Sequence, residues 1–273
     1  FLFTTEETDG QMTLTIEEYL GNATEVSVPA SVQGIPVTKI DNFAFSGRDL
    51  TSLVLPEGLI SIEPNAFDDC TELRSIVLPE SLKQIGESAF SGCASLRSVT
   101  VPGNVSFLLG AFVNCTGLQS VVLSEGITAI GDIAFSGCRN LTSIVIPQSV
   151  TSIGSYAFVY CDSLLNVILP DGITDIRSDA FKDCADTLKL YCREGSVTAA
   201  TLKAAGFTAS YYDPEAAAEF TCEQVETEEG PALIITGYTG GTLMLEIPAQ
   251  IDGLPVVAIG DGAFAALEEL AGV

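Results

Sequence analysis

A segment of 22 or 23 residues recurs along most of this chain and limits the folds that it can adopt. Each copy contains an Ala-Phe pair, and in most copies a Cys follows the Phe by three residues. A fixed period in this range is typical of a solenoid that stacks one coil per repeat. The sequence therefore predicts a stack of coils that buries the Phe and Cys of every repeat. These are Phe45, Phe67, Phe90, Phe112, Phe135, Phe158 and Phe181, with Cys70, Cys93, Cys115, Cys138, Cys161 and Cys184.

Each copy also contains a short alternation of polar and apolar residues that ends at a proline. In one copy this alternation runs from Ser143 to Ile146 and is followed by Pro147. Alternation of this kind predicts a strand with Ile144 and Ile146 facing inward. Because proline cannot donate to a strand ladder, Pro147 should end the strand. Successive coils should pair these strands in a parallel sheet.

Two smaller features of the repeat predict local structure. A glycine comes shortly before several Ala-Phe pairs, at Gly86, Gly131 and Gly154, where its conformational freedom suits a turn. The third repeat is one residue short, which we place near residues 105–107. We therefore expect one irregular coil there.

Both ends of the array depart from the repeat. In residues 1–23, Met12, Leu14 and Ile16 alternate with polar residues, which predicts a β cap over the open edge of the first coil. The solenoid should then span residues 24–213. Near its end, Ser196 is a good N-cap and Gly206 a good stop for a short Ala-rich helix. A closing strand should follow the helix.

The last part of the chain predicts a second unit. Residues 214–219 form a short linker, and residues 220–273 repeat the spacing of the opening segment. We expect these 54 residues to be a new cap and a first coil, truncated before a second coil. Because one coil cannot bury its own apolar face, this unit could dock on the first domain, self-associate with another molecule or remain loosely ordered.

Acidic residues outnumber basic ones, 36 against 11, which gives a net charge of −25. Nucleic acids and anionic membranes are bound by clusters of Lys and Arg, so neither is an expected partner. No apolar run approaches the roughly 20 residues of a membrane span, and we expect no membrane insertion. The acidity fits a soluble protein that is extracellular or displayed on a cell surface. No signal peptide is visible, and we expect a mature form from which it has been removed.

The absence of histidine narrows the possible chemistry. It excludes Ser-His-Asp and Cys-His catalysis and the common zinc sites. Acidic turns such as Asp68-Asp69 could bind Ca²⁺, although no D-x-D-x-D-G order is present. We predict no catalytic residue, no metal site and no cofactor, and calcium in the turns is the alternative that stays open.

The row of cysteines has three interpretations. The first treats them as small buried apolar residues that stay free thiols. The second pairs neighbouring coils by disulfides, but parallel Cβ directions would keep the Cβ atoms too far apart. The third is a metal site, for which a linear row without histidine is unsuitable. Cys222 lies outside the row, and the sequence leaves its state open.

The outward positions of the predicted strands form the candidate binding face. One row consists of Ser and Asn, the next consists of β-branched residues, and two arginines flank them. Small and β-branched residues suit a strand in any case, but the same surface could be a mildly apolar groove whose arginines bind an acidic partner. The candidate residues are Ser75, Val77, Ser98, Thr100, Ser120, Val122, Ser143, Val145, Asn166, Ile168, Arg74 and Arg97.

The complete repeat resembles a known family. Its pattern, Cys-x-x-Leu-x-x-Val/Ile-x-Leu/Ile-Pro followed by Ile-Gly-x-x-Ala-Phe, is similar to the BspA-like leucine-rich repeats of bacterial and protozoan surface proteins. The resemblance covers roughly residues 24–213. It implies a right-handed leucine-rich-repeat superhelix of the α/β type, with short parallel strands on the concave face, few helices and a β-rich N-terminal cap. It also implies surface display and adhesion.

Three functions are compatible with this reading of the sequence. The first is a non-enzymatic interaction module that binds a protein or a glycan. The second is a structural spacer or stalk that displays another domain. The third is a glycosidase with a pair of carboxylates, but the outward strand positions carry no Asp or Glu. We favour the interaction module and keep the spacer as the alternative.

Overall fold

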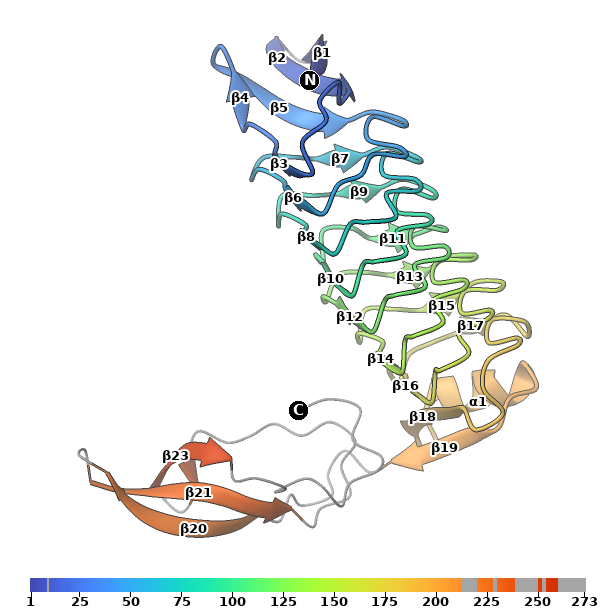
Figure 1. Ribbon diagram of the computed structural model, residues 1–273. Coiled ribbons are helices and arrows are strands. Elements are labelled where there is room, and N and C mark those ends of the chain that lie inside the picture. The colour runs from blue at the N-terminus through green and yellow to red at the C-terminus, as the bar shows by residue number, and fades with distance from the viewer. Residues whose placement is uncertain (9, 213–219, 228–229, 239–249, 252–253, 260–273) are drawn as a thin grey trace.

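The computed structural model describes residues 1–8, 10–212, 220–227, 230–238, 250–251 and 254–259. From residue 24 to residue 212 the chain forms a β-solenoid of parallel strands, as the repeat predicts (Figure 1). Its coils stack along one axis, from the N-terminal hairpin to a single helix among the described residues. This helix, α1 (Val197–Ala204), is too short to cross a membrane, and no other described segment forms a long apolar helix.

The first row of strands contains the alternating segments predicted from the sequence. Val145 pairs with Ile168 and Ile168 with Tyr191, so equivalent residues of successive coils are neighbours. We call this row the first sheet. It consists of β3 (Glu25–Ser27), β6 (Ser52–Val54), β8 (Ser75–Val77), β10 (Ser98–Val101), β12 (Ser120–Leu123), β14 (Ser143–Val145), β16 (Asn166–Ile168), β18 (Lys189–Arg193) and β19 (Ala209–Tyr212).

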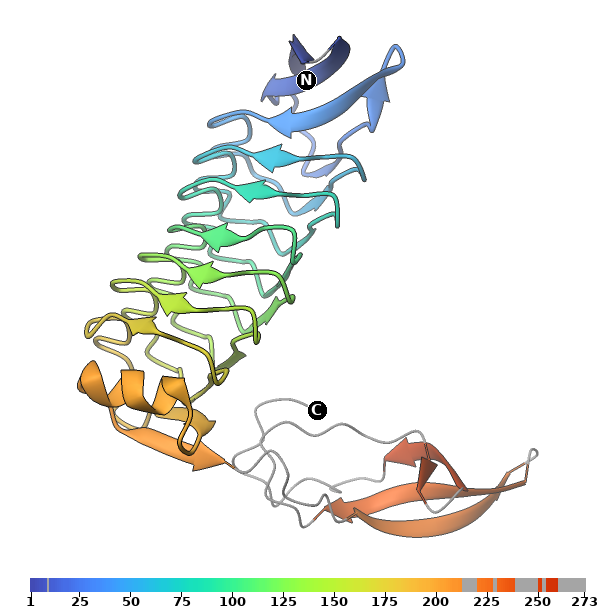
Figure 2. The ribbon, with the colours of Figure 1, turned by 180° about the vertical axis from the view of Figure 1, so that it is seen from behind.

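A second row of strands, which the sequence analysis did not predict, runs along another side of the solenoid (Figure 2). Most of its members have only two residues, of which the second points inward and is buried. We call this row the second sheet. It contains β5 (Ile35–Ile40), β7 (Ser61–Ile62), β9 (Gln84–Ile85), β11 (Phe107–Leu108), β13 (Ala129–Ile130), β15 (Ser152–Ile153) and β17 (Asp175–Ile176).

The glycines before the Ala-Phe pairs begin turns, since the carbonyl of Gly86 accepts from the N–H of Ala89 at 3.2 Å. The predicted reason, their conformational freedom, is wrong. Gly86, Gly131 and Gly154 directly follow strands of the second sheet and do not have positive φ. A Cβ on Gly86 would collide with the backbone of Glu63 and Pro64 in the preceding coil, and one on Gly131 with the carbonyl of Leu108. Glycine is therefore required here because the backbones of adjacent coils approach each other closely.

The irregular coil also lies slightly later than predicted. Leu108 and Phe112 are separated by four positions, whereas Ile85 and Phe90 are separated by five. The missing residue is therefore at Leu109, after β11, and the chain bends there before Gly110. Gly110 has φ 55°, and its N–H donates to the carbonyl of Asp132 at 2.9 Å, so the coil is regular again from this point.

The regular spacing of the Ala-Phe pairs places one phenylalanine ring per coil in a column along the third side of the solenoid. Consecutive phenylalanines from Phe45 to Phe181 have ring centroids 5.0 to 5.5 Å apart, with nearly parallel planes. Tyr19 stacks on the first ring and Phe207 meets the last one edge-on. Six of the seven phenylalanines are completely buried and Phe181 is 6% exposed, which confirms their predicted place in the core.

The cysteines of the repeat lie beside this column as free thiols. Each Sγ from Cys70 to Cys184 lies within 3.0 to 3.3 Å of the carbonyl oxygen of the Phe in the preceding coil, to which it donates. Burial raises the pKa of the Cys70 thiol to about 12 and that of the Cys184 thiol to about 11. The cysteines of the row are buried as predicted, except that Cys184 is half-buried. The side chain of Cys222 is outside the part of the chain described.

A hairpin lies at one end of the solenoid, and a helix and a strand lie at the other. Strands β1 (Leu2–Thr8) and β2 (Gln11–Glu18) form an antiparallel hairpin that joins β5 in parallel. At the other end, Ser196 caps α1 by accepting from the N–H of Ala199 at 3.1 Å, and Gly206 follows with φ 89°. Helix α1 then leads into β19, which closes the first sheet.

The described strands after residue 219 repeat the pairing of the N-terminal cap. They are β20 (Phe220–Thr227), β21 (Gly230–Tyr238), β22 (Gln250–Ile251) and β23 (Leu254–Ile259). Leu233 pairs with Val256 and Ile235 with Ile259, just as Leu14 pairs with Val37 and Ile16 with Ile40. In both strand pairs the register also shifts by one residue, after Leu14 in the first and after Leu233 in the second. The linker at 214–219 and much of the predicted second unit lie outside the described residues.

Removing one ring from the column should destabilise the solenoid strongly. Phe135→Ala is expected to lower the free energy of unfolding by about 3–5 kcal/mol, because it leaves a cavity between two stacked rings. Phe43→Ala is a matched control, since Phe43 is 58% exposed, and it should change stability by no more than about 0.5 kcal/mol. Urea unfolding of both variants measures the difference, and equal stabilities would contradict the packing described.

The buried thiols should make stability depend on alkaline pH. The pKa of Cys138 is raised well above its ordinary value by burial, whereas an unfolded thiol ionises near pH 8.5. Above that pH the unfolded chain binds fewer protons than the native chain, so stability falls as the pH rises, by about 1.4 kcal/mol per pH unit for each thiol. This loss continues until the pH reaches the native pKa.

Cys138→Ser isolates the contribution of one thiol. Serine can still donate to the carbonyl of Phe112, which Cys138 contacts at 3.3 Å, but it does not ionise in this range. Between pH 8.5 and pH 10 the wild type should lose about 2 kcal/mol more than the variant. Urea unfolding of both proteins at the two pH values tests this. Ionisation of tyrosine and lysine changes the stability of both proteins alike, so the difference between them reports on Cys138. The same loss in both proteins would show that Cys138 does not ionise on unfolding.

Candidate binding surfaces

The outward side chains of the first sheet are exposed mainly in its N-terminal half. Val54 is 56% exposed, Val77 77% and Val122 54%, so an aliphatic stripe crosses neighbouring coils. Serines lie beside the stripe and form a second row. Among the candidate residues, the exposed ones are Ser75, Val77, Ser98, Thr100, Ser120 and Val122, and the half-buried ones are Ser143, Val145 and Asn166.

Ile168 was predicted to be part of the exposed face, and this is wrong. Its side chain is only 3% exposed, and the equivalent Tyr191 of the next coil is 4% exposed. The two pack together with Val145 in a small apolar cluster separate from the main core. The larger side chains at this end of the sheet bury one another, whereas the smaller Val and Thr side chains nearer the N-terminus stay open.

Arg74 and Arg97 lie next to each other at the start of the first-sheet strands. The N–H of Arg97 donates to the carbonyl of Arg74 at 3.3 Å, and that of Gln119 donates to the carbonyl of Arg97 at 2.8 Å. The three residues therefore occupy consecutive coils. They line a depression of about 470 Å³ together with Ala94, Ser95, Gly117 and Asn140.

These two arginines differ from most other cations of the solenoid. Arg48 pairs with Glu18 at 3.0 Å and Arg139 with Asp162 at 3.0 Å. Neither Arg74 nor Arg97 has an ion pair with any residue that the structure describes. In a chain with a net charge of −25, two adjacent guanidinium groups without carboxylates form a local positive site for an external anion.

The described residues contain no cluster that could hold a metal ion. No three carboxylates or thiols among them come together with suitable geometry. The turn at Asp68-Asp69 uses Asp69 in the left-handed backbone region, with φ 54°.

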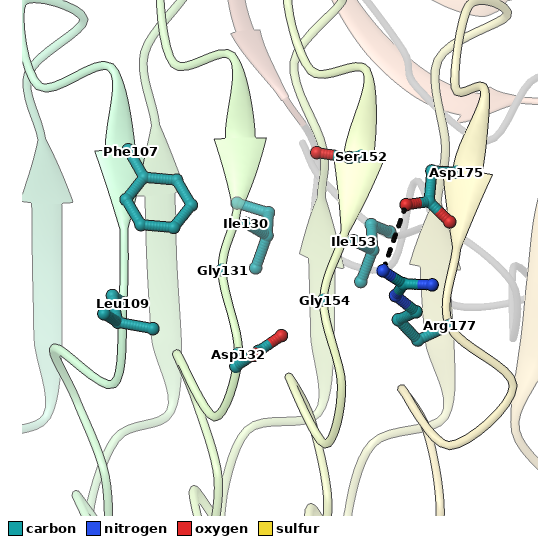
Figure 3. A pocket seen from close by; sticks show the side chains of 10 residues that line it. All are labelled: Phe107, Leu109, Ile130, Gly131, Asp132, Ser152, Ile153, Gly154, Asp175 and Arg177. Carbon is teal, nitrogen blue, oxygen red and sulfur yellow. Dashed lines mark ion pairs between the residues drawn. The ribbon is translucent and has the colours of Figure 1, made fainter.

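A second depression lies on the outer face of the second sheet, where the sequence analysis placed no candidate residue (Figure 3). Its volume is about 200 Å³. Phe107 and Leu109 form one wall, and Asp175 and Arg177 form the other. Between them the coils carry the small residues Gly131, Ser152 and Gly154, which keep the floor low, and the carboxylate of Asp132. We call this site the trough.

The short third repeat is what creates the apolar wall of the trough. Because one residue is missing after β11, Leu109 occupies the place that glycine takes in the neighbouring coils. Phe107 occupies the place of Ala129 and Ser152, with which β11 aligns through β13 and β15. The Phe107 ring lies over Gly131, since a Cβ there would collide with the ring, and it stays 48% exposed.

The polar groups of the trough face the open space from several coils. Asp132 accepts from the N–H of Ser155 at 2.7 Å through Oδ1. Arg177 and Asp175 form an ion pair at 3.9 Å, and both side chains are more than half exposed. At this distance the ion pair is weak, so both groups can accept or donate hydrogen bonds to a ligand. Two-residue strands give no clear alternation in the sequence, which is why this site was missed.

Comparison with known proteins agrees with the repeat pattern. The model of the BspA-type leucine-rich repeat region matches residues 38–138 and 106–200, with six copies. The chain belongs to the BspA-type leucine-rich repeat family. Members of this fold family are generally non-enzymatic. No curated protein matches the chain significantly.

Comparison with solved structures finds one leucine-rich repeat protein that shares the fold and others with weaker similarity. The chain is similar to one from Eubacterium ventriosum, with 23% identity and a TM-score of 0.58 over 70% of this chain and 52% of that protein. It thus spans about half the length of that protein. A leucine-rich cell surface protein from Faecalibacterium prausnitzii has 24% identity and a TM-score of 0.46 over 95% and 73% of the two chains. The pneumococcal vaccine antigen PcpA has 20% identity and a TM-score of 0.45 over 76% and 47%.

Proposed function

We propose that this leucine-rich repeat chain is a non-enzymatic interaction module, extracellular or on a cell surface, that binds a partner protein with its first sheet. The observation that carries the proposal is the exposed stripe of Val54, Val77 and Val122 beside Arg74 and Arg97, which form no ion pair within the described part of the chain. Stripes of this kind bury apolar area against a partner, while arginines at the edge orient it.

The expected partner has a surface complementary to these two features. It carries a flat apolar strip bordered by carboxylates, because the stripe is aliphatic and the adjacent depression is cationic. The rest of the chain is strongly acidic and repels partners with the same charge elsewhere on their surface. This combination favours a specific orientation on the sheet over unspecific adhesion.

The extracellular location is part of the proposal. It is supported by the acidity of the chain and by the surface proteins that its repeat resembles. Self-association through residues 220–273 stays a prediction, because most of that segment lies outside the described residues. A glycan partner is treated separately below, because it involves the other sheet.

Binding of purified extracellular-matrix proteins to the immobilised intact chain tests the proposal. At least one matrix protein should bind, and Val77→Glu should weaken its affinity about tenfold or more. Val77 is 77% exposed, so the substitution places a charge in the centre of the stripe with little effect on stability. Thermal unfolding of the variant verifies that it is folded.

The role of the arginines is tested against a control with the same change in charge. Arg74→Ala with Arg97→Ala should weaken binding and reduce its dependence on salt, because the pair contacts carboxylates of the partner. Lys83→Ala with Lys203→Ala removes two exposed cations outside the depression and should have little effect. Equal effects of the two double variants would contradict a specific site. A chain that binds no matrix protein would instead favour the spacer.

A further inference from the structure

The trough on the second sheet has the features of a carbohydrate site. We propose that it binds one neutral pyranose ring, as the end or a side group of a glycan, with the sugar packed on Phe107 between the two walls. This goes beyond the proposed function, because the trough lies on a different sheet and uses none of the residues assigned to the partner protein.

The size of the trough indicates a single ring. Its volume of about 200 Å³ is below the roughly 300–1,000 Å³ of sites for drug-sized ligands. Phe107 and Asp175 belong to coils three steps apart, which is about 14 Å for strands spaced 4.8 Å. After the side chains of both walls are subtracted, the remaining gap suits one flat ring seated on the floor.

The apolar wall provides a platform for the ring. An aromatic ring has an electron-rich face, and the C–H groups on one face of a pyranose pack against it. Phe107 is 48% exposed and is held over Gly131 by close contact with the backbone below. No neighbouring coil within the described part of the second sheet carries another aromatic residue at this position, so the platform occurs once.

The floor and the opposite wall provide hydrogen-bonding groups suited to hydroxyls. Asp132 and Asp175 offer carboxylate oxygens, Arg177 offers N–H donors, and Ser152 lies half-buried on the floor. Hydrogen bonds between charged groups and neutral hydroxyls are worth more than those between neutral groups. A sugar has hydroxyls around its edge, so a ring that stacks on Phe107 can satisfy groups from several coils.

The charge of the site favours a neutral sugar over an acidic one. The trough has two carboxylates and one guanidinium, and the whole chain has a net charge of −25. A uronic or sialic acid would face repulsion from Asp132 and Asp175, whereas a neutral ring would only donate its hydroxyl protons to them. An extended peptide is a different class of ligand, and it has no equivalent ring of donors for these oxygens.

Saturation-transfer NMR with the intact chain tests the proposal. The probes are methyl β-D-glucopyranoside, methyl α-D-mannopyranoside and methyl β-D-galactopyranoside. At least one should receive saturation, most strongly at the protons of one ring face. Phe107→Ala should reduce its affinity about tenfold or more, and Phe107→Tyr should retain it because the ring is kept. Phe43→Ala is the matched control, since Phe43 is exposed at another part of the solenoid.

A second variant keeps the test decisive if Phe107→Ala folds poorly. Asp175→Asn removes one charged acceptor at an exposed position and should weaken sugar binding about tenfold. Asp49→Asn makes the same change in charge at an exposed position outside the trough and should leave binding unchanged. The proposal is overturned if none of the three glycosides receives saturation, or if Phe107→Ala and Asp175→Asn bind like the wild type. It is also overturned if a library of short peptides binds at Phe107 and the sugars do not.

Discussion

Stacking of one phenylalanine ring per coil is the interaction on which the solenoid depends. Each ring from Phe67 to Phe158 lies between two others, so no coil can bury its own ring without both neighbours. The backbone reinforces the column, because the N–H of Phe67 donates to the carbonyl of Ala89 in the next coil at 2.8 Å. Because the column fixes one side of every coil, the outward positions of the two sheets can differ in residue type from coil to coil.

The column also holds a backbone conformation that is unfavourable on its own. Two residues before and two after most of these phenylalanines, the chain has positive φ, often at residues other than glycine. Ile133, with φ 51°, is a β-branched residue in a region that such residues rarely adopt. A backbone of this kind persists only when the surrounding packing determines it. Burial of the ring between the two positions provides that packing.

The sequence predicted the features that repeat and missed those that depend on neighbouring coils. The Phe column, the buried Cys row, the first sheet and the capped helix at Ser196 all follow from spacing and residue type. The second sheet did not, because a strand of two residues such as Ser152–Ile153 shows no alternation. The burial of Ile168 depends on Tyr191 one coil later, and the trough depends on a missing residue in one coil beside small residues in the next two. Contacts of this kind become visible only when the coils are stacked.

In an oxidising compartment, folding of the repeat cysteines into the core competes with disulfide formation. The native thiols are protected, because burial disfavours the reactive thiolate and each Sγ is held by a carbonyl. Before folding, the same cysteines are exposed, evenly spaced and able to pair wrongly. Formation of disulfides takes seconds to hours, whereas local loops and hairpins close in microseconds or less. Since each coil contacts mainly the next one along the chain, burial of the repeat cysteines needs only the neighbouring coils to form and not the whole array.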